Sequence, residues 1–460
     1  MISAVAKDVT FTYRGAKRCS LEGINVHAAE GEVTLLCGAS GSGKTSALRL
    51  FNGLIPSFHD GELSGRVRVG DLDVPRTPLG ELAEVCATVF QNPRTQFYTT
   101  HVIQELAFGL ENLGRDPAQI RERIRNVATQ VRVEHLLEKR CSRLSGGQMQ
   151  LVACAVALCA TTPLIVFDEP TANLDDESIH ALRHLIELLK AEGHTIVVAE
   201  HRLSFLAGIA DRAYVFDKGR IVRQCNGEEF FSISDAERRE LGLRSLACLP
   251  GAEKPAPTGP GLLIENLAFG YRRREPVLDI DHMLFPAGRV TALTGENGAG
   301  KTTLARLICG LERTRHGRMM LGDKPLKRGD AYLIMQDPTR QLFADTVVDE
   351  VTLGLKKRER AEADSMTLLE QLDLADHASD HPQALSGGQR QRLVIATAQA
   401  ARRKIYIFDE PTSGVGYRHL KAISHTMRHL ADSGAVVIVI THDQELIEEA
   451  ADHVNRLGSS

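Results

Sequence analysis

The sequence of 460 residues contains no tryptophan, and only 5% of its residues are aromatic. It also lacks a strong net charge, because the formal charge is −4 at pH 7 and the pI is about 6.5. Nucleic-acid-binding domains are usually clearly basic, so this balance argues against nucleic acid as a partner. The hydrophobic (43%) and charged (25%) fractions are those of an ordinary soluble globular protein. The length predicts about two to four domains.

The nine cysteines are odd in number and form no C-x-x-C pair. This pattern argues against a disulfide framework, a zinc site or an iron–sulfur site, and it fits thiols in a reducing compartment. No run of about 18 apolar residues occurs, and the first residues lack the apolar core of a signal peptide. We therefore expect a chain that does not itself cross a membrane.

Three phrases occur twice, in the same order. They are "GASGSGKT" at 38–45 and "GENGAGKT" at 295–302, "LSGGQMQ" at 144–150 and "LSGGQRQ" at 385–391, and "FDEP" at 167–170 and 408–411. The second copy is shorter between its first two phrases. Such a repeat predicts two copies of one folding unit.

Between the copies lies "LPGAEKPAPTGPG" at 249–261, which is rich in Pro and Gly and has no apolar period. This composition is typical of a linker. The predicted domains are therefore residues 1–248 and 262–460. The second copy stops at Ser460, so we expect no further regulatory domain in this chain.

Within each copy, short Val/Ile/Leu runs alternate with helical stretches. Examples are "EVTLLCG" at 32–38, "PLIVFDE" at 163–169 and "HTIVVAEH" at 194–201. Near-continuous apolar strands that alternate with helices predict an α/β fold with a parallel sheet covered on both faces.

Residues 38–45 follow a predicted strand and precede a predicted helix, which is the context of a phosphate-binding loop. Its glycines let backbone N–H groups surround phosphate oxygens, and the helix N-terminus adds partial positive charge. Lys44 is predicted to neutralise the β- and γ-phosphates, and Thr45 to ligand Mg²⁺. Lys301 and Thr302 take these roles in the second copy.

Asp168 and Asp409 each end a buried apolar strand, where a lone carboxylate would be costly. A magnesium ion shared with the threonine of the phosphate loop would offset that cost. The neighbouring Glu169 and Glu410 are placed to orient the attacking water. An acidic N-cap after a strand is the alternative interpretation of the same residues.

A later glutamine (Gln91, Gln336), the "LSGGQ" phrase and a final histidine (His201, His442) complete the set in each copy. Together these motifs resemble the ATP-binding-cassette (ABC) ATPases over almost the whole chain. The resemblance implies two tandem P-loop NTPase domains, each with a parallel sheet core and a helical subdomain. In that family two cassettes close head to tail, so each ATP lies between the phosphate loop of one and the signature of the other.

The resemblance thus implies two composite sites. One joins Lys44, Thr45, Gln91, Asp168, Glu169 and His201 to Ser386, Gly387, Gly388 and Gln389; the other joins Lys301, Thr302, Gln336, Asp409, Glu410 and His442 to Ser145, Gly146, Gly147 and Gln148. The remaining predicted ATP contacts are Tyr13, Gly38, Ala39, Ser40, Gly41, Ser42, Gly43, Ser46, Tyr271, Gly295, Glu296, Asn297, Gly298, Ala299, Gly300 and Thr303. The predicted Mg²⁺ ligands are Thr45, Gln91, Asp168, Thr302, Gln336 and Asp409.

Two aromatic residues match the adenine-stacking position of the family. Tyr13 and Tyr271 are separated by almost the same number of residues as the two phosphate loops. A flat aromatic face is what a base needs, although a strand tyrosine is more often a packing residue. In the same way, His201 and His442 match the histidine that senses the γ-phosphate, and solvated turn histidines are the alternative.

The segments after the glutamines, 91–112 and 336–357, pair a polar turn with an aromatic and an apolar helical pattern. Simple packing of a helical subdomain accounts for many of those apolar residues. In family transporters this region docks the membrane subunit, and "NPRTQF", "ELAFGLEN", "DEVTLG" and "AEHRL" resemble the energy-coupling-factor importers of vitamins or transition-metal ions.

That resemblance predicts an ATPase that drives solute import from the cytoplasmic face of the cell membrane. Its partners would be a transmembrane coupling protein and a substrate-binding membrane protein. Two alternatives are a soluble twin-cassette ATPase acting on ribosomes or nucleic acid, and a fused sugar-importer ATPase. The ribosomal class usually has charged connectors or basic extensions, whereas this linker is short and Pro-rich.

One position breaks the symmetry of the copies. "FDEPTANLD" ends in Asp175, whereas "FDEPTSGVG" places Gly416 there. In the family this loop crosses the interface toward the facing phosphate loop. The missing carboxylate predicts either a lost helix cap or a functional difference between the two sites.

Overall fold

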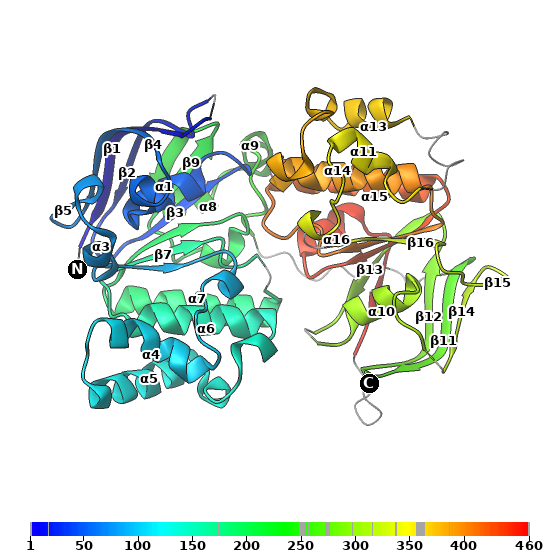
Figure 1. Cartoon of the computed structure of the whole chain (residues 1–460), viewed down its shortest axis with the longest axis horizontal. Helices are drawn as coiled ribbons and strands as arrows, with labels where there is room; N and C mark the ends of the chain where they lie inside the picture. The colour runs from blue at the N-terminus through cyan, green and yellow to red at the C-terminus, as the bar shows by residue number, and fades with distance from the viewer. Residues whose placement is uncertain are drawn as a thin grey trace. The chain divides into compact units, whose positions relative to one another are not determined.

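The computed structural model describes residues 2–16, 18–172, 174–247, 254, 258–271, 277–296, 298–314, 316–335, 338–355, 364–385 and 387–458. The chain divides into two compact units. Unit 1 comprises Met1–Cys248 with Gly416–Arg418, and unit 2 comprises Leu249–Val415 with His419–Ser460. Figure 1 shows strands and helices of both units along the chain.

The central sheet of unit 1 has six strands in the order β10-β9-β3-β8-β7-β6. They are β3 Val33–Gly38, β6 Cys86–Val89, β7 Leu164–Asp168, β8 Thr195–Ala199, β9 Arg212–Asp217 and β10 Arg220–Asn226. All neighbours are parallel except β10, which pairs antiparallel with β9. Every residue of β3, β7 and β8 is buried, as expected for strands covered on both faces.

Alternate residues along these strands enter two different hydrophobic cores. In β7, Ile165 and Phe167 join the core formed with the large helices, whereas Leu164 and Val166 join the core on the opposite face. This alternation follows from the period of two of a β-strand. The sheet is therefore the middle layer of unit 1.

One face of the sheet carries the helical subdomain and α7. The helices of unit 1 are α1 Lys44–Phe51, α2 Leu54–Ser57, α3 Leu79–Ala83, α4 Val102–Asn112, α5 Pro117–Val131, α6 Gly146–Cys159, α7 Asp176–Ala191, α8 Gly227–Phe231 and α9 Asp235–Glu240. Helices α4, α5 and α6 pack on one another, and their buried residues share one core with α7.

The other face carries α1 and a second, antiparallel sheet. Its strands are β1 Ala4–Tyr13, β2 Leu21–Ala28, β4 Gly61–Val69 and β5 Leu72–Asp73, in the order β2-β1-β4-β5. Buried and exposed residues largely alternate in β2, as expected for a sheet with one solvated face. The sequence motifs did not predict this sheet. Its first strand, β1, ends at Tyr13.

Unit 2 repeats the plan. Its central strands are β13 Arg289–Thr294, β16 Ala331–Ile334, β17 Ile405–Asp409, β18 Val436–Ile440 and β19 His453–Arg456, all parallel, in the order β16-β17-β18-β13-β19. The antiparallel strands are β11 Gly261–Phe269, β12 Leu278–Pro286, β14 Arg318–Leu321 and β15 Lys324–Pro325. The helices are α10 Lys301–Ile308, α11 Val347–Thr352, α13 Ser365–Gln371, α14 Gly387–Ala401, α15 Tyr417–Asp432 and α16 Gln444–Ala450.

The predicted α/β class with parallel central sheets and helical subdomains is confirmed. Strand β11 begins at Gly261, the last residue of the predicted linker, and most of the linker lies outside the described residues. Within the described ranges, no helix is both long enough and apolar enough to span a membrane.

Candidate nucleotide-binding sites

The phosphate loop of unit 1 lies between β3 and α1, as predicted. Gly38 has a φ of 138°, and a Cβ there would lie 2.1 Å from the carbonyl oxygen of Phe216. Gly43 has a φ of 107°, and its Cβ would lie 2.7 Å from the carbonyl oxygen of Ser20. Only glycine fits both positions, because each combines a left-handed backbone with a close backbone neighbour.

Lys44 is buried and folds back across its own loop. Its Nζ donates to the carbonyl oxygens of Gly38 and Ala39, at 3.0 Å each. It also lies 3.3 Å from Nε2 of His201. Burial lowers the pKa of the ammonium, and the nearby Glu169 carboxylate opposes this shift most strongly. The ammonium therefore lies where phosphate oxygens could replace its carbonyl acceptors.

Thr45 and Asp168 meet as the motifs predicted. The Thr45 hydroxyl donates to Oδ1 of Asp168 at 3.0 Å. Burial raises the pKa of Asp168 to about 6, the Glu169 charge adds to this, and the Thr45 hydrogen bond opposes it. A buried carboxylate beside a hydroxyl oxygen provides the hard oxygen ligands that Mg²⁺ prefers. The residues present therefore fit a magnesium ion.

Glu169 is surrounded by the other two predicted catalytic residues of unit 1. Nε2 of Gln91 donates to its Oε2 at 2.8 Å, and Nε2 of His201 lies 3.4 Å from its Oε1. The backbone of Glu169 has a φ of 47°, a left-handed conformation that is uncommon outside glycine. Burial raises the pKa of its carboxyl to about 7, and Lys44 opposes the shift. A carboxyl with a pKa near neutrality is suited to exchange a proton with water.

Tyr13 lies beside the start of α1. Its hydroxyl is 2.9 Å from Oγ of Ser46 and accepts from Nη1 of Arg49 at 3.2 Å. The ring meets Phe11 edge to face at 4.8 Å and His59 at 6.0 Å. It thus packs on neighbours and also borders the phosphate loop, so adenine stacking stays a prediction.

The phosphate loop of unit 2 has the same construction. Gly295 has a φ of 143°, and a Cβ there would lie 2.2 Å from the carbonyl oxygen of Leu457. Nζ of Lys301 donates to the carbonyl oxygens of Gly295 and Glu296 at 2.5 and 2.9 Å. Tyr271 is 55% exposed, and its hydroxyl lies 3.5 Å from Oγ1 of Thr303.

In unit 2, one of the two predicted carboxylates contacts this loop and the other lies near the histidine. The Thr302 hydroxyl donates to Oδ2 of Asp409 at 3.2 Å, and burial raises the pKa of that carboxyl. Nε2 of His442 lies 3.9 Å from Oε1 of Glu410. The predicted residues Asn297, Gln336 and Ser386 lie outside the described residues.

The signature residues lie at helix starts and contact other parts of their units. Ser145 caps α6 and forms a reciprocal capping box with Gln148. A Cβ on Gly147 would lie 2.4 Å from Oγ of Ser178 in α7. In unit 2, Gly387 begins α14, a Cβ on Gly388 would lie 2.8 Å from Nε2 of His419, and Nε2 of Gln389 lies 2.8 Å from Nε2 of His377. The pairing of each signature with the other unit's phosphate loop stays a prediction.

One buried residue near the unit 1 site was missed by the motif analysis. Glu200 is 2% exposed and accepts hydrogen bonds from the backbone N–H groups of Thr171, His201 and Arg202. The available signal was a charged residue at the end of the apolar run "HTIVVAEH".

Comparison with known proteins identifies the family of this chain. The model of the family described as "ABC transporter" matches residues 21–172 and 278–413. The chain belongs to the ABC transporter family. A relative from Treponema denticola, provisionally named an ABC transporter ATP-binding protein, is 36% identical over 97% of this chain and 94% of its own length. Another from Bacillus subtilis, provisionally named the HMP/thiamine import ATP-binding protein YkoD, is 33% identical over 97% and 88%.

Among solved structures, a model of ribosome-bound archaeal Pelota and ABCE1 matches 98% of this chain and 76% of that chain, with a TM-score of 0.70 and 21% identity. This likeness concerns the fold alone. ABC ATP-binding domains hydrolyse ATP, and the chain is an ATP hydrolase of this type.

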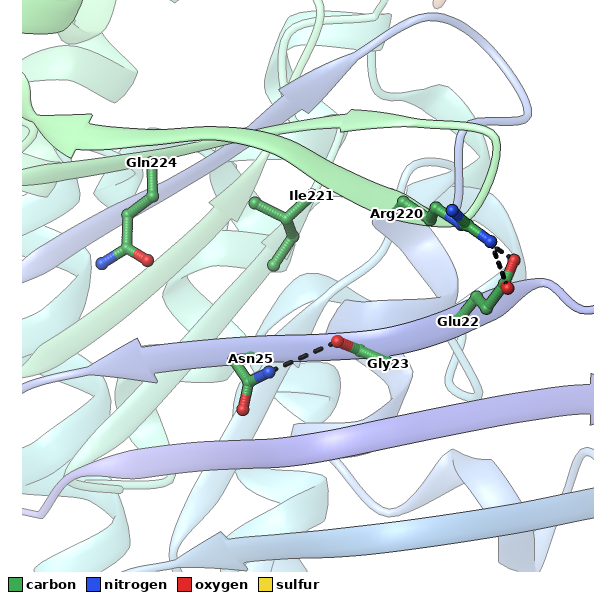
Figure 2. A pocket seen from close by; sticks show the side chains of 6 residues that line it. All are labelled: Glu22, Gly23, Asn25, Arg220, Ile221 and Gln224. Atoms are coloured by element: carbon green, nitrogen blue, oxygen red, sulfur yellow. Dashed lines mark hydrogen bonds and ion pairs between the residues drawn. The ribbon is translucent and has the colours of Figure 1, made fainter.

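This ABC protein also has an open concavity of about 480 Å³ in unit 1, and none of the residues that line it is a predicted ATP contact. Figure 2 shows it where strand β2 runs beside strand β10. It is lined by Glu22, Gly23, Asn25, Arg220, Ile221 and Gln224. Nε of Arg220 donates to Oε2 of Glu22 at 3.0 Å, so the charged groups at one end satisfy each other.

Proposed function

We propose that this ABC ATPase is the ATP-hydrolysing subunit of an importer of the energy-coupling-factor type. It would bind a transmembrane coupling protein and a substrate-binding membrane protein at the cytoplasmic face of the cell membrane. The observation that carries the proposal is an exposed aromatic residue, held in place by a buried glutamate, in the segment after the glutamine motif of unit 1 and at the matching place in unit 2.

In unit 1 the exposed aromatic is Tyr98, which is 78% exposed. Its ring stacks on Phe108 of α4, with centroids 5.5 Å apart and planes 17° from parallel. Ile103 and Leu113 are exposed on the same helix or just after it. The stacked rings of Tyr98 and Phe108 are contiguous apolar surface, which is typical of a protein interaction site.

A buried carboxylate of α4 holds the Tyr98 loop. Glu105 accepts hydrogen bonds from the backbone N–H groups of Tyr98 and Thr99, and from the Thr99 hydroxyl at 2.8 Å. Burying a carboxylate is unfavourable unless hydrogen bonds satisfy it, and here the donors all come from one loop. The loop is therefore preorganised with its aromatic side chain toward solvent.

Unit 2 has the same arrangement of an exposed aromatic residue and a buried glutamate. Phe343 is 75% exposed, and the buried Glu350 of α11 accepts from the backbone N–H groups of Phe343 and Ala344 at 2.7 and 2.6 Å. Preorganisation lowers the entropy cost of binding a partner. The same arrangement in both units supports a partner that presents two similar surfaces.

The segment proposed to dock the membrane partner in unit 1, residues 91–112, is linked to the candidate ATP site. Gln91 begins the segment in unit 1, and its side chain donates to Glu169. A change at Glu169 during hydrolysis would therefore reach the Tyr98 loop along a short stretch of chain. In unit 2 the corresponding Gln336 lies outside the described residues.

Within this proposal, both ATP sites form when the units close head to tail. Mg²⁺ would be held by the threonine and aspartate of each site together with the glutamine, namely Thr45, Asp168 and Gln91, and Thr302, Asp409 and Gln336. Magnesium would neutralise the phosphate oxygens. Lys44 and Lys301 would bind the phosphates, and Glu169 and Glu410 would orient the water and accept its proton.

The name of the Bacillus subtilis relative, which refers to HMP/thiamine import, supports a vitamin as the solute. Uptake of vitamins of this type and of transition-metal ions, compared between a strain lacking the gene and its complemented parent, tests the solute class. Loss of uptake for one compound identifies it. Unchanged uptake of every compound would contradict both solute classes.

Membrane association tests the docking surface. The double variant Tyr98→Ala/Phe343→Ala should leave the membrane fraction and lose uptake, while the isolated chain keeps its ATPase activity. Phe58→Ala is a matched control, because Phe58 is 73% exposed and lies outside this segment. Full membrane association of the double variant, or co-sedimentation of the parent chain with ribosomes, would overturn the proposal.

A further inference from the structure

The two units position their predicted γ-phosphate-sensing histidines, His201 and His442, with different residues. The phrase around the histidine is "EHR" at 200–202 in unit 1 and "THD" at 441–443 in unit 2. A carboxylate thus precedes the histidine in unit 1 and follows it in unit 2. Both carboxylates are buried.

In unit 1, Glu200 bridges two segments of the site. Its Oε2 accepts from the backbone N–H and the hydroxyl of Thr171, at 3.1 and 2.7 Å. Its Oε1 accepts from the backbone N–H groups of His201 and Arg202, at 2.6 and 3.0 Å. Thr171 follows the Asp-Glu-Pro motif, so one carboxylate connects the segment of His201 to the segment of Glu169.

In unit 2, Asp443 makes the corresponding connection. Its Oδ2 accepts from the hydroxyl of Thr412, the counterpart of Thr171, at 2.6 Å. Thr441 stands in the place of Glu200, and its hydroxyl lies 3.4 Å from Oε2 of Glu410. Arg202, in the place of Asp443, donates instead to the carbonyl oxygen of Leu174 at 3.2 Å.

We propose that Glu200 is a positioning residue for ATP hydrolysis in unit 1, where it fixes His201 relative to Glu169 as Asp443 fixes His442 in unit 2. In both units a carboxylate connects the same two segments. In unit 1 that carboxylate precedes the histidine in the sequence, and in unit 2 it follows the histidine. Exchanging the pair of flanking residues should therefore preserve function where changing one does not. The inference rests on ATP hydrolysis and not on the proposed import.

The geometry explains why one change fails. Four donors converge on the two oxygens of Glu200, and each oxygen accepts two of them. Glu200→Thr removes both carboxylate oxygens and leaves one hydroxyl for four converging donors, and an unsatisfied buried donor is costlier than the loss of an exposed hydrogen bond. Arg202→Asp then offers a carboxylate at the position from which unit 2 reaches its threonine.

The experiment compares full-length chains by steady-state ATP hydrolysis and thermal melting. Glu200→Thr should lower kcat by about two- to tenfold, the smaller factor applying where the two sites turn over independently. The KM for ATP should change by less than about twofold, because the phosphate loop is untouched. Glu200→Thr/Arg202→Asp should recover most of the parental kcat, and Glu30→Gln, on the surface of unit 1, is the control.

The same substitutions, made in a Glu169→Gln chain, distinguish a positioning role of Glu200 from a role in folding alone. Glu200→Thr should have little further effect on turnover there, because Glu200 acts through the Glu169 and His201 segments. If Glu200→Thr does not fold, Glu200→Asp, which is shorter by one methylene, takes its place with the same expected decrease in kcat. An unchanged kcat would overturn the proposal. So would a decrease in kcat that the paired exchange does not restore when it does restore the melting temperature.

Discussion

At the scale of single residues, the candidate ATP site of unit 1 is a group of buried charges. Asp168 and Glu169 are adjacent and buried, with Lys44 as the nearby cation. Burial raises the pKa of both carboxyls, so without a cation their ionised forms are unfavourable. Ionising these carboxyls in the folded, nucleotide-free protein is therefore electrostatically unfavourable, at the place where ATP and a divalent cation are predicted to bind.

Glu169→Gln should stabilise the nucleotide-free chain at pH 8 and have little effect at pH 5. Burial raises the pKa of Glu169 from 4.5 to about 7. The stability that the protonated carboxyl contributes is present below pH 4.5 and is lost as the pH rises through 7. At pH 8 a neutral glutamine avoids a cost of about 1–3 kcal/mol.

Thermal melting of both chains at pH 5 and pH 8, without nucleotide or divalent cations, measures this difference. Glu30→Gln serves as the surface control and should shift neither curve. A stabilisation of equal size at the two pH values would show that ionisation of Glu169 is not the cause.

At the scale of secondary-structure elements, the asymmetry between Asp175 and Gly416 lies at a helix start. Asp175 is the N-cap of α7, and its side chain accepts from the backbone N–H of Ser178 at 3.0 Å. Gly416 immediately precedes α15 and has no side chain to accept such a bond. The structure thus provides a capping role for Asp175 beside the predicted role at the interface.

Asp175→Ala should lower the stability of the chain by about 0.5–2 kcal/mol, whereas Asp175→Asn should retain it because asparagine is an equally good N-cap. Urea denaturation measures this. The ATPase rate of the asparagine variant then separates the two roles. A parental rate supports capping alone, and a slow rate at full stability supports a need for the carboxylate, in which case Gly416→Asp should raise the activity of the parent.

At the scale of the whole molecule, the chain contains two similar but unequal candidate ATP sites. Glu169 accepts from Gln91 at 2.8 Å and lies 3.4 Å from His201, whereas His442 lies 3.9 Å from Glu410. Glu200 and Asp443 add a further difference. Two sites in one chain need not contribute equally to turnover.

Glu169→Gln and Glu410→Gln should each lower steady-state ATP hydrolysis, by different factors, and the double variant should lower it by roughly 100-fold or more while ATP binding is retained. Coupled-enzyme assays and equilibrium nucleotide binding measure these effects. Equal effects of the single variants would remove the asymmetry, and a double variant with parental activity would exclude both glutamates from catalysis.

Several features were predictable because their causes are local in the sequence. The glycines of residues 38–45, the helix that begins at Lys44 and the strand that ends at Asp168 depend on nearby residues and apolar periodicity. The repeat carried each of these predictions from unit 1 to unit 2.

Other features depend on residues that are distant along the chain. Strand β1 pairs with β4, about 60 residues later, and no motif records that pairing. The bond from Gln91 to Glu169 and the bridge from Glu200 to Thr171 likewise join segments that only the central sheet brings together.

The sequence by itself determined the family and the residue types that are predicted to form each ATP site, because phosphate and magnesium chemistry needs particular groups at short, fixed spacings. Only the tertiary structure decided how those groups are held. Buried carboxylates such as Glu200 and Glu105 take their roles from the donors that surround them, and those donors are assembled by folding.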